Sequence, residues 1–195
     1  MSTPEIIIET IVTTRRADGG VHIVPLGMRR EGELILLAPF RPSATLDNLL
    51  RERHAVVNLS DDVRVFAGCL CGRRDWPTVA ASRIPGVRLA NSLAHLELQL
   101  ERVEDDELRP RLLCREVHAE THAPFRGFNR AQSAVVEACI LVSRLHMLPA
   151  EKIRSEIDYL SIAIAKTAGP SEAEAWGWLM ARVDAHFAAA RAGTP

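Results

Sequence analysis

The feature that most constrains the fold is a strict alternation of apolar and polar residues within Asn91–Val103. Leucines occupy every second position from Leu96 to Leu100, and charged or amide side chains fill the positions between them. A period of two residues is that of a strand with one face buried and the other in water, which is common in antiparallel sheets. The segment therefore predicts an antiparallel sheet.

Further strands are predicted on both sides of this segment, joined mostly by short turns. Asp18 and Gly19 suit a tight hairpin, because the glycine supplies a positive φ. The predicted strands are Glu5–Thr14, Val21–Met28, Glu33–Ala38, His54–Ser60, Val63–Gly68 and Arg111–Ala119. Exposed sheet edges invite aggregation, so a closed or nearly closed barrel over residues 1–125 is expected. Residues 72–90 are interpreted as a loop or insertion.

After Pro124 the apolar pattern changes to a helical period. Asn129 is the expected N-cap of a first helix, and Ser171 with Glu174 is a candidate capping box for the last one. Prolines and a glycine separate the segments. The predicted helices are Phe128–Leu148, Ala150–Ala168 and Glu172–Arg191. The expected fold class is therefore α+β.

Composition narrows the class of protein. The chain has 195 residues, is 47% hydrophobic and carries a formal net charge of −1, which favours a globular protein over a general nucleic-acid binder. No apolar run approaches the roughly 18 residues that span a bilayer, and the N-terminal MSTPEIIIET has no secretory-signal pattern. A cytoplasmic protein without nucleic-acid or membrane partners is expected, with four reduced cysteines: Cys69, Cys71, Cys114 and Cys139.

The segment Leu34–Asp62 places polar side chains between two apolar strands. Arg41, Ser43 and Thr45 lie in a loop that leads into a short amphipathic helix. A guanidinium, two hydroxyls and the backbone N–H groups of a helix start are suitable donors for an anion. The alternative is that Ser43 or Thr45 only caps the helix while Arg41 is solvated. The residues alone leave both interpretations open.

The second strand of the first hairpin is interrupted by Pro25 and Gly27. A proline cannot donate to a sheet, and a glycine within a strand often marks a bulge or a close approach to the backbone. The interruption therefore indicates either an ordinary edge bulge or a place where a ligand lies against the chain.

Two motifs near the domain junction also have a structural and a functional interpretation. His118 and His122 are four residues apart, but on a strand such positions lie about 13 Å apart, so no metal site is predicted. Arg126 and Arg130 flank an aromatic–glycine–aromatic turn. They either contact an anion or an aromatic ring system, or they are solvated surface arginines.

The order of these motifs resembles that of the FMN-binding split β-barrel proteins of the flavin reductase-like type. The similarity rests on ETIVTT, a DG turn, VPLGM, LILLAPFRPSATLDNLL and AVVNLSDD, in this order. The helix FNRAQSAVVEA extends it to an uncharacterised flavoprotein family of archaea and methylotrophic bacteria. The resemblance implies a split antiparallel barrel over residues 1–125, followed by a helical segment over residues 126–195.

The resemblance also implies an FMN-binding homodimer, with each flavin near the subunit interface and a small-molecule redox partner. No catalytic side chain is implied, because the flavin carries the chemistry. The implied function is an FMN-dependent oxidoreductase. The alternative is a non-catalytic carrier of FMN, a pterin or a deazaflavin in one-carbon metabolism. The implied cofactor-binding residues are Thr13, Pro25, Leu26, Gly27, Arg41, Ser43, Thr45, Asn48 and Asn58.

Overall fold

The computed structural model describes residues 6–192, and the chain divides into two compact units. The first contains the chain up to Ser60 together with Trp76–Phe125. The second contains Asp61–Asp75 together with the chain from Arg126 onward. None of the helices within the described residues carries an apolar stretch long enough to cross a bilayer.

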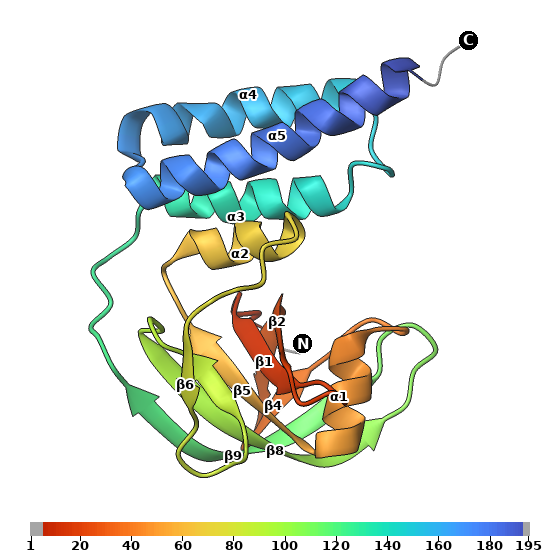
Figure 1. Ribbon diagram of the computed structural model, residues 1–195, viewed down its shortest axis with the longest axis vertical. Helices are drawn as coiled ribbons and strands as arrows, with labels where there is room; N and C mark the ends of the chain where they lie inside the picture. Colours follow the sequence, from red (N-terminus) through yellow and green to blue (C-terminus); the bar gives the residue numbers. More distant parts are fainter. Residues whose placement is uncertain (1–5, 193–195) are drawn as a thin grey trace, which may run out of the picture. The chain divides into compact units, whose positions relative to one another are not determined.

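Seven strands form one antiparallel sheet in the first unit, in the order β2-β1-β5-β8-β9-β4-β3. Figure 1 shows the long strands β8 and β9 of this sheet side by side and α1 next to it. The edge strands β2 and β3 follow each other in the chain and are joined only by Leu26 and Gly27. The sheet must therefore curl until its two edges approach, which gives the predicted barrel. The strands are β1 Ile11–Arg15, β2 Val21–Pro25, β3 Met28–Glu31, β4 Leu34–Leu37, β5 His54–Leu59, β8 Ala94–Glu104 and β9 Arg111–Thr121.

The predicted first two strands are shorter than expected. Ile8 makes only an isolated bridge to Met28 ahead of β1, and the predicted start at Glu5 lies outside the described residues. The predicted strand Val21–Met28 is divided into β2 and β3 at the Leu26–Gly27 link. Proline at the end of β2 and glycine in the link explain this division, because neither residue favours a continuous ladder.

The inner face of the barrel is lined by the residues that the alternation predicts. Leu96, Leu98 and Leu100 of β8 are buried, and the helix α1 (Ala44–Glu52) adds Leu46 and Leu49 to the same core. Burying one such side chain contributes about 1.5–3 kcal/mol, so this cluster is the main source of stability for the barrel.

The outer face of β8 is not solvated along its whole length, contrary to the simple alternation. The side chains of His95 and Glu97 are 1% and 0% exposed. The segment after α2 covers them, and it contains a hairpin of β6 (Thr78–Ala80) and β7 (Val87–Leu89). The predicted loop over these residues thus contains two strands, and strands of three residues are too short to show a period in the sequence.

Glu97 holds this covering segment against the barrel through hydrogen bonds. Its carboxylate accepts hydrogen bonds from the backbone N–H groups of Ser82, Arg83 and Ile84, the last two at 2.7 and 3.0 Å. Burial raises the pKa of the Glu97 carboxyl, but these three bonds and His95 outweigh it, so the pKa lies below its ordinary value. The carboxylate is therefore ionised and acts only as an acceptor.

Asn58 also holds the hairpin against the barrel through hydrogen bonds. Its Nδ2 donates to the carbonyl of Ile11 at 3.0 Å, and its Oδ1 accepts from the N–H of Leu89 at 2.7 Å. The neighbouring Thr13 hydroxyl donates to the carbonyl of Val87. Asn58 and Thr13 are 0% and 2% exposed, so their polar atoms do not reach water and depend on these hydrogen bonds.

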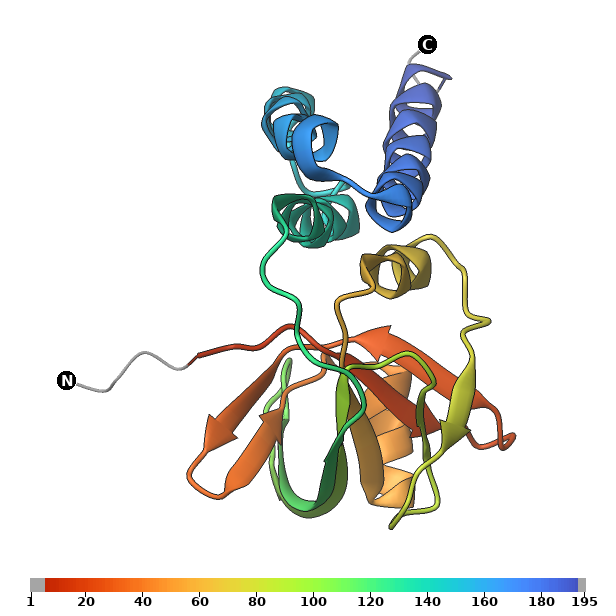
Figure 2. The ribbon, with the colours of Figure 1, turned by 90° about the vertical axis from the view of Figure 1, so that its left-hand side faces the viewer.

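The second unit is helical. Helix α2 packs on α3 and α5, and α3 also packs on α4 and α5, as the nearly end-on view of these helices in Figure 2 shows. The helices are α2 Val63–Leu70, α3 Arg130–Ser143, α4 Ala150–Thr167 and α5 Pro170–Ala192.

The predicted strand Val63–Gly68 is wrong, because this segment forms most of α2. The side chain of Asp62 caps the helix by accepting from the N–H of Arg64 at 3.1 Å, and the Arg64 guanidinium returns to the same carboxylate. Two valines and a phenylalanine favour a strand by propensity, but the segment is buried on nearly all sides. An all-apolar run of this length does not distinguish a strand from a helix.

The helix starts in the second half of the chain are partly as predicted. The Asn129 side chain caps α3 by accepting from the N–H of Ala131 at 2.8 Å. Helix α5 begins earlier than expected, at Pro170, and Glu172 rather than Glu174 reaches back, accepting from the N–H of Gly169 at 2.9 Å. The predicted capping box was wrong because the proline takes the first helical position, which suits its missing N–H.

None of the four cysteines, all within the described residues, forms a disulfide bond. Cys69 lies in the last turn of α2, and Cys71 directly follows that helix. Burial raises the pKa of the Cys69 thiol to about 11 and those of Cys114 and Cys139 to about 12. These thiols are protonated near neutral pH and are weak nucleophiles.

The Asn58→Ala substitution is expected to lower the free energy of unfolding by about 2–4 kcal/mol, since it leaves the Leu89 N–H and the Ile11 carbonyl buried without the amide. Urea denaturation measures the loss. The matched control is Asn91→Ala, at an exposed position, which should change stability by less than about 0.5 kcal/mol. Equal stability of the two variants would contradict the anchoring role.

Candidate functional site

The start of α1 is the first part of the predicted site. Ser43 is the N-cap: its backbone is extended, and its Oγ accepts from the N–H of Leu46 at 3.3 Å. The Ser43 carbonyl accepts from the N–H of Asp47 at 3.1 Å. The capping interpretation of Ser43 is therefore confirmed. It does not exclude an anion, because the capping oxygen acts as an acceptor and its hydroxyl hydrogen can still be donated.

Thr45 lies in the first turn of α1 and is 3% exposed. Its Oγ1 is 3.0 Å from Nε2 of His22, a half-buried residue on β2, and the two share a hydrogen bond. His22 was not among the residues predicted for the site. The only local signal was a polar side chain within the otherwise apolar run VHIVP.

Asn48 holds α1 against the barrel, and both ends of its amide are occupied. Its Nδ2 donates to Oγ1 of Thr14 at 3.0 Å, and its Oδ1 accepts from Arg51 Nη2 at 3.1 Å. The Arg51 guanidinium also donates to the Arg15 carbonyl at 2.6 Å. These bonds hold α1 against strand β1.

Arg41 lies outside this hydrogen-bonded group. Its guanidinium pairs with Asp105, in the turn between β8 and β9, at 2.9 Å, and the two side chains are 40% and 76% exposed. Its backbone N–H donates to the carbonyl of Leu108 at 2.8 Å. An ion pair this exposed contributes only about 0–1 kcal/mol, so the Arg41 side chain remains available to another anion.

The interrupted strand forms the second part of the predicted site. The N–H of Leu26 donates to the Thr10 carbonyl at 2.9 Å, and the Thr10 hydroxyl donates to the Leu26 carbonyl at 2.6 Å. A Cβ atom on Gly27 would lie 2.7 Å from Cγ2 of Ile7. Gly27 thus allows a close approach, and the approaching group is the side chain of Ile7, while a ligand lying against this segment stays a prediction. Pro25 is half-buried and ends β2, paired with Ile11.

Thr13 and Asn58 are not part of the group around the start of α1. Successive side chains of a strand point to opposite faces, so Thr14 faces Asn48 whereas Thr13 faces β7. The structure thus divides the nine implied residues into three groups. Arg41, Ser43, Thr45 and Asn48 surround the start of α1; Pro25, Leu26 and Gly27 follow β2; Thr13 and Asn58 lie under the hairpin.

The two other motifs are placed differently from each other. Arg126 and Arg130 are exposed, in the segment before α3 and in its first turn.

His118 is on β9 and His122 directly follows it, and both rings contact His95 of β8. Burial, followed by the Arg88 guanidinium, lowers the pKa of His122 below its ordinary value. The side chains of His118 and His122 are thus brought together through the ring of His95.

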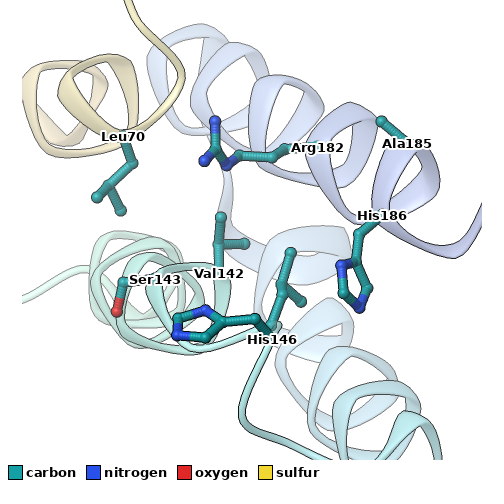
Figure 3. A pocket seen from close by; sticks show the side chains of 8 residues that line it. Leu70, Val142, Ser143, His146, Arg182, Ala185 and His186 are labelled. Carbon is teal, nitrogen blue, oxygen red and sulfur yellow. The ribbon is translucent and has the colours of Figure 1, made fainter. Parts of the chain in front are cut away.

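A pocket of about 500 Å³ lies in the helical unit and includes none of the implied cofactor residues. Figure 3 shows its lining from α2, α3 and α5, with the imidazoles of His146 and His186 and the guanidinium of Arg182 around it. His146 and Arg182 are exposed, so the pocket is an open depression with a basic rim.

The fold is that of the split β-barrel flavoproteins, as comparison with solved structures shows. The FMN-bound protein MM1853 from Methanosarcina mazei aligns with a TM-score of 0.78 at 19% identity, covering 90% of this chain and 94% of that one. The 2-nitrobenzoate 2-nitroreductase NbaA from Pseudomonas fluorescens aligns with a TM-score of 0.52 at 20% identity, covering 62% and 66%. BorF, the flavin reductase component of a bacterial two-component tryptophan halogenase, aligns with 0.51 at 20%, covering 61% and 82%.

The chain belongs to the family described as "Protein of unknown function (DUF447)". The N-terminal domain profile of the family matches residues 8–123, and its C-terminal profile matches residues 129–181. No match was found among curated protein sequences. The resemblance to the flavin reductase-like split barrels is therefore confirmed at the level of family and fold.

The Ser43→Ala substitution is expected to lower the free energy of unfolding by about 1 kcal/mol, the usual effect of removing a serine N-cap. Thermal or urea denaturation measures this. Ser133→Ala is the matched control, because Ser133 is exposed in the body of α3. An effect of Ser43→Ala no larger than that of the control would show that the hydroxyl does not stabilise α1.

Proposed function

We propose that this protein binds FMN and is an oxidoreductase of the flavin reductase-like type. The main support is its similarity, over 90% of the chain, to an FMN-bound member of the same family. The arrangement at the start of α1 provides independent support from the chain's own residues. The hydroxyls of Ser43 and Thr45, the ring of His22 and the N–H groups of the helix start gather in this region.

The phosphate of FMN is proposed to bind at the first turn of α1. The hydroxyls of Ser43 and Thr45 provide hydrogen bonds, and the positive end of the helix dipole favours an anion there. His22 lies against Thr45 and adds a ring nitrogen that can carry a proton. Arg41 can turn from its exposed partner to the phosphate at little cost.

The isoalloxazine ring is proposed to lie along Pro25–Gly27. Pro25, the first residue of this segment, lies three residues after His22 on β2, and three residues of strand span roughly 10 Å, which leaves room for the ribityl chain. Ile7 packs on Gly27 and is 51% exposed, so it can present an apolar surface to the ring. Thr13, Asn48 and Asn58 are proposed to hold the barrel, the hairpin and α1 in place rather than to touch the cofactor, since protein groups already occupy their polar atoms.

Bound FMN supplies hydride and electron transfer to an oxidoreductase. The chain's part is to bind and orient the cofactor, and for this task no side-chain acid or base is required. The named activities of two similar folds, a nitroreductase and a flavin reductase component, support redox chemistry over simple storage.

The double substitution Ser43→Ala with Thr45→Ala is expected to weaken FMN binding by roughly 1–3 kcal/mol, the value of hydrogen bonds to a charged group. Titration of the apoprotein with FMN, followed by flavin fluorescence quenching, measures the affinity. Ser133→Ala is the control and should bind FMN as the wild type does. Quenching with unchanged affinity in the double variant would exclude the α1 start as the phosphate site.

The redox proposal is tested separately by anaerobic mixing of the FMN-loaded protein with NADH or NADPH. We expect bleaching of the flavin absorbance band at a catalytic rate, because the reductase-like type takes hydride from a nicotinamide. An FMN-loaded protein that neither nucleotide bleaches would contradict the reductase assignment and favour a carrier. Failure to bind FMN at all would overturn the whole proposal.

The protein is also proposed to form a homodimer. Within the described part of the barrel unit, Ile6 and Phe40 are 79% and 63% exposed, and such apolar side chains on a surface favour a protein interface. Sedimentation equilibrium should give twice the chain mass of 21.5 kDa. Replacing both residues, in Ile6→Ser with Phe40→Ser, should shift the equilibrium to monomer. A wild-type mass of a single chain would contradict the dimer.

A further inference from the structure

The outer face of β8 and β9, together with the residue after β9, carries five ionisable side chains, which we call the histidine cluster: His95, Glu97, His118, Glu120 and His122. The strand register pairs His95 with Glu120 and Glu97 with His118, so these four side chains leave the sheet on one face. His122 follows the last residue of β9, and its N–H donates to the carbonyl of Leu93 at 2.7 Å. That bond turns the end of β9 back toward the start of β8.

His95 is the central residue of the cluster. Its Nε2 lies 3.2 Å from Oε1 of Glu97, and its Nδ1 lies 2.9 Å from Nε2 of His122. Because the Glu97 carboxylate already accepts three backbone N–H groups, it acts as an acceptor toward His95 as well. His95 therefore carries its proton on Nε2, and the lone pair of Nδ1 is directed at His122.

We propose that His95, His122 and Glu120 bind a divalent transition-metal ion, most suitably Zn²⁺. One ligand atom from each of the three side chains lies within 4.8 Å of the other two. Two imidazole nitrogens and a carboxylate oxygen form a ligand set that zinc accepts. The Glu120 side chain is 51% exposed, so the ion can enter from solvent and keep one coordination position for water.

The distances require only a small adjustment. Nitrogens bound to zinc at about 2.0–2.1 Å lie roughly 3.3 Å apart in a tetrahedral shell, a few tenths of an ångström more than in the structure. The rings of His95 and His122 are nearly parallel, at 11°, with centroids 5.0 Å apart. In this arrangement the two nitrogens share one proton, and the proposed ion takes the place of that proton.

The surroundings have the organisation of a metal site beyond its ligands. Histidine ligands commonly donate their other ring N–H to a carboxylate, which sets the tautomer and orients the ring, and Glu97 is placed to do this for His95. His118 adds a buried Nε2 without a hydrogen-bond partner among the described residues, 3.6 Å from Oε2 of Glu120. His118 is thus placed to orient the Glu120 carboxylate.

The proposal is tested by isothermal titration of the purified full-length chain with ZnCl₂ after removal of bound metals by a chelator. We expect one saturable ion per chain and a rise in Tm with zinc, because a ligand that binds only the folded state stabilises it. Glu120→Gln, at an exposed position, and His122→Ala should each weaken binding at least 10-fold. Glu97→Gln should weaken it about 10–100-fold, as for other outer-shell partners.

Two control variants separate this site from incidental binding. His146→Ala removes an exposed histidine of the helical unit, and Cys69→Ser with Cys71→Ser removes two neighbouring thiols; both should keep the wild-type zinc affinity. Absence of saturable binding, equal losses in His146→Ala and Glu120→Gln, or loss in the cysteine variant would each overturn the proposal. The test uses zinc alone and is independent of FMN binding.

Discussion

The fold depends on the two-residue connection between β2 and β3. Because Leu26 and Gly27 alone join the two edge strands of the sheet, the sheet curls and its leucine face becomes a closed interior. The same closure brings Ile7 onto Gly27 at a distance that a side chain would prevent. It also sets His22 on β2 opposite the first turn of α1, where Thr45 meets it. A constraint on the backbone thus determines where the polar groups of the candidate cofactor site gather.

The outer face of the barrel is partly covered by the chain itself. Strands with one polar face normally leave that face in water, but here the hairpin of β6 and β7 covers part of it. Burying polar side chains is costly unless they are hydrogen-bonded, and Asn58 and Glu97 meet that requirement by accepting backbone N–H groups from the covering segment. The cover in turn fixes His95 in one tautomer. The ordered histidine cluster is therefore a product of the hairpin as much as of the strands that carry it.

The parts of the fold that the sequence predicts correctly depend on residues that are close together in the chain. The alternation around Leu98, the glycine at the Asp18–Gly19 turn and the Asn129 cap each depend on a few adjacent positions, and the structure contains all three. Helix α2 was missed because its run of apolar residues has no clear period, and the hairpin because its strands are short. His22 and His95 were missed for another reason. Their partners lie 23 and 27 residues away, in elements that only the folded barrel brings together.

Thr13 and Thr14 show why a motif alone does not assign a functional role. The two threonines are adjacent in β1, both are buried, and both would contribute equally to a match with VTT. The strand geometry sends the Thr14 hydroxyl to Asn48 of α1 and the Thr13 hydroxyl to Val87 of the hairpin. Each hydroxyl thus supports a different polar group, one at the candidate cofactor site and one beneath the hairpin. A motif match identifies which residues the fold needs, whereas the direction of each side chain decides which of them can reach a ligand.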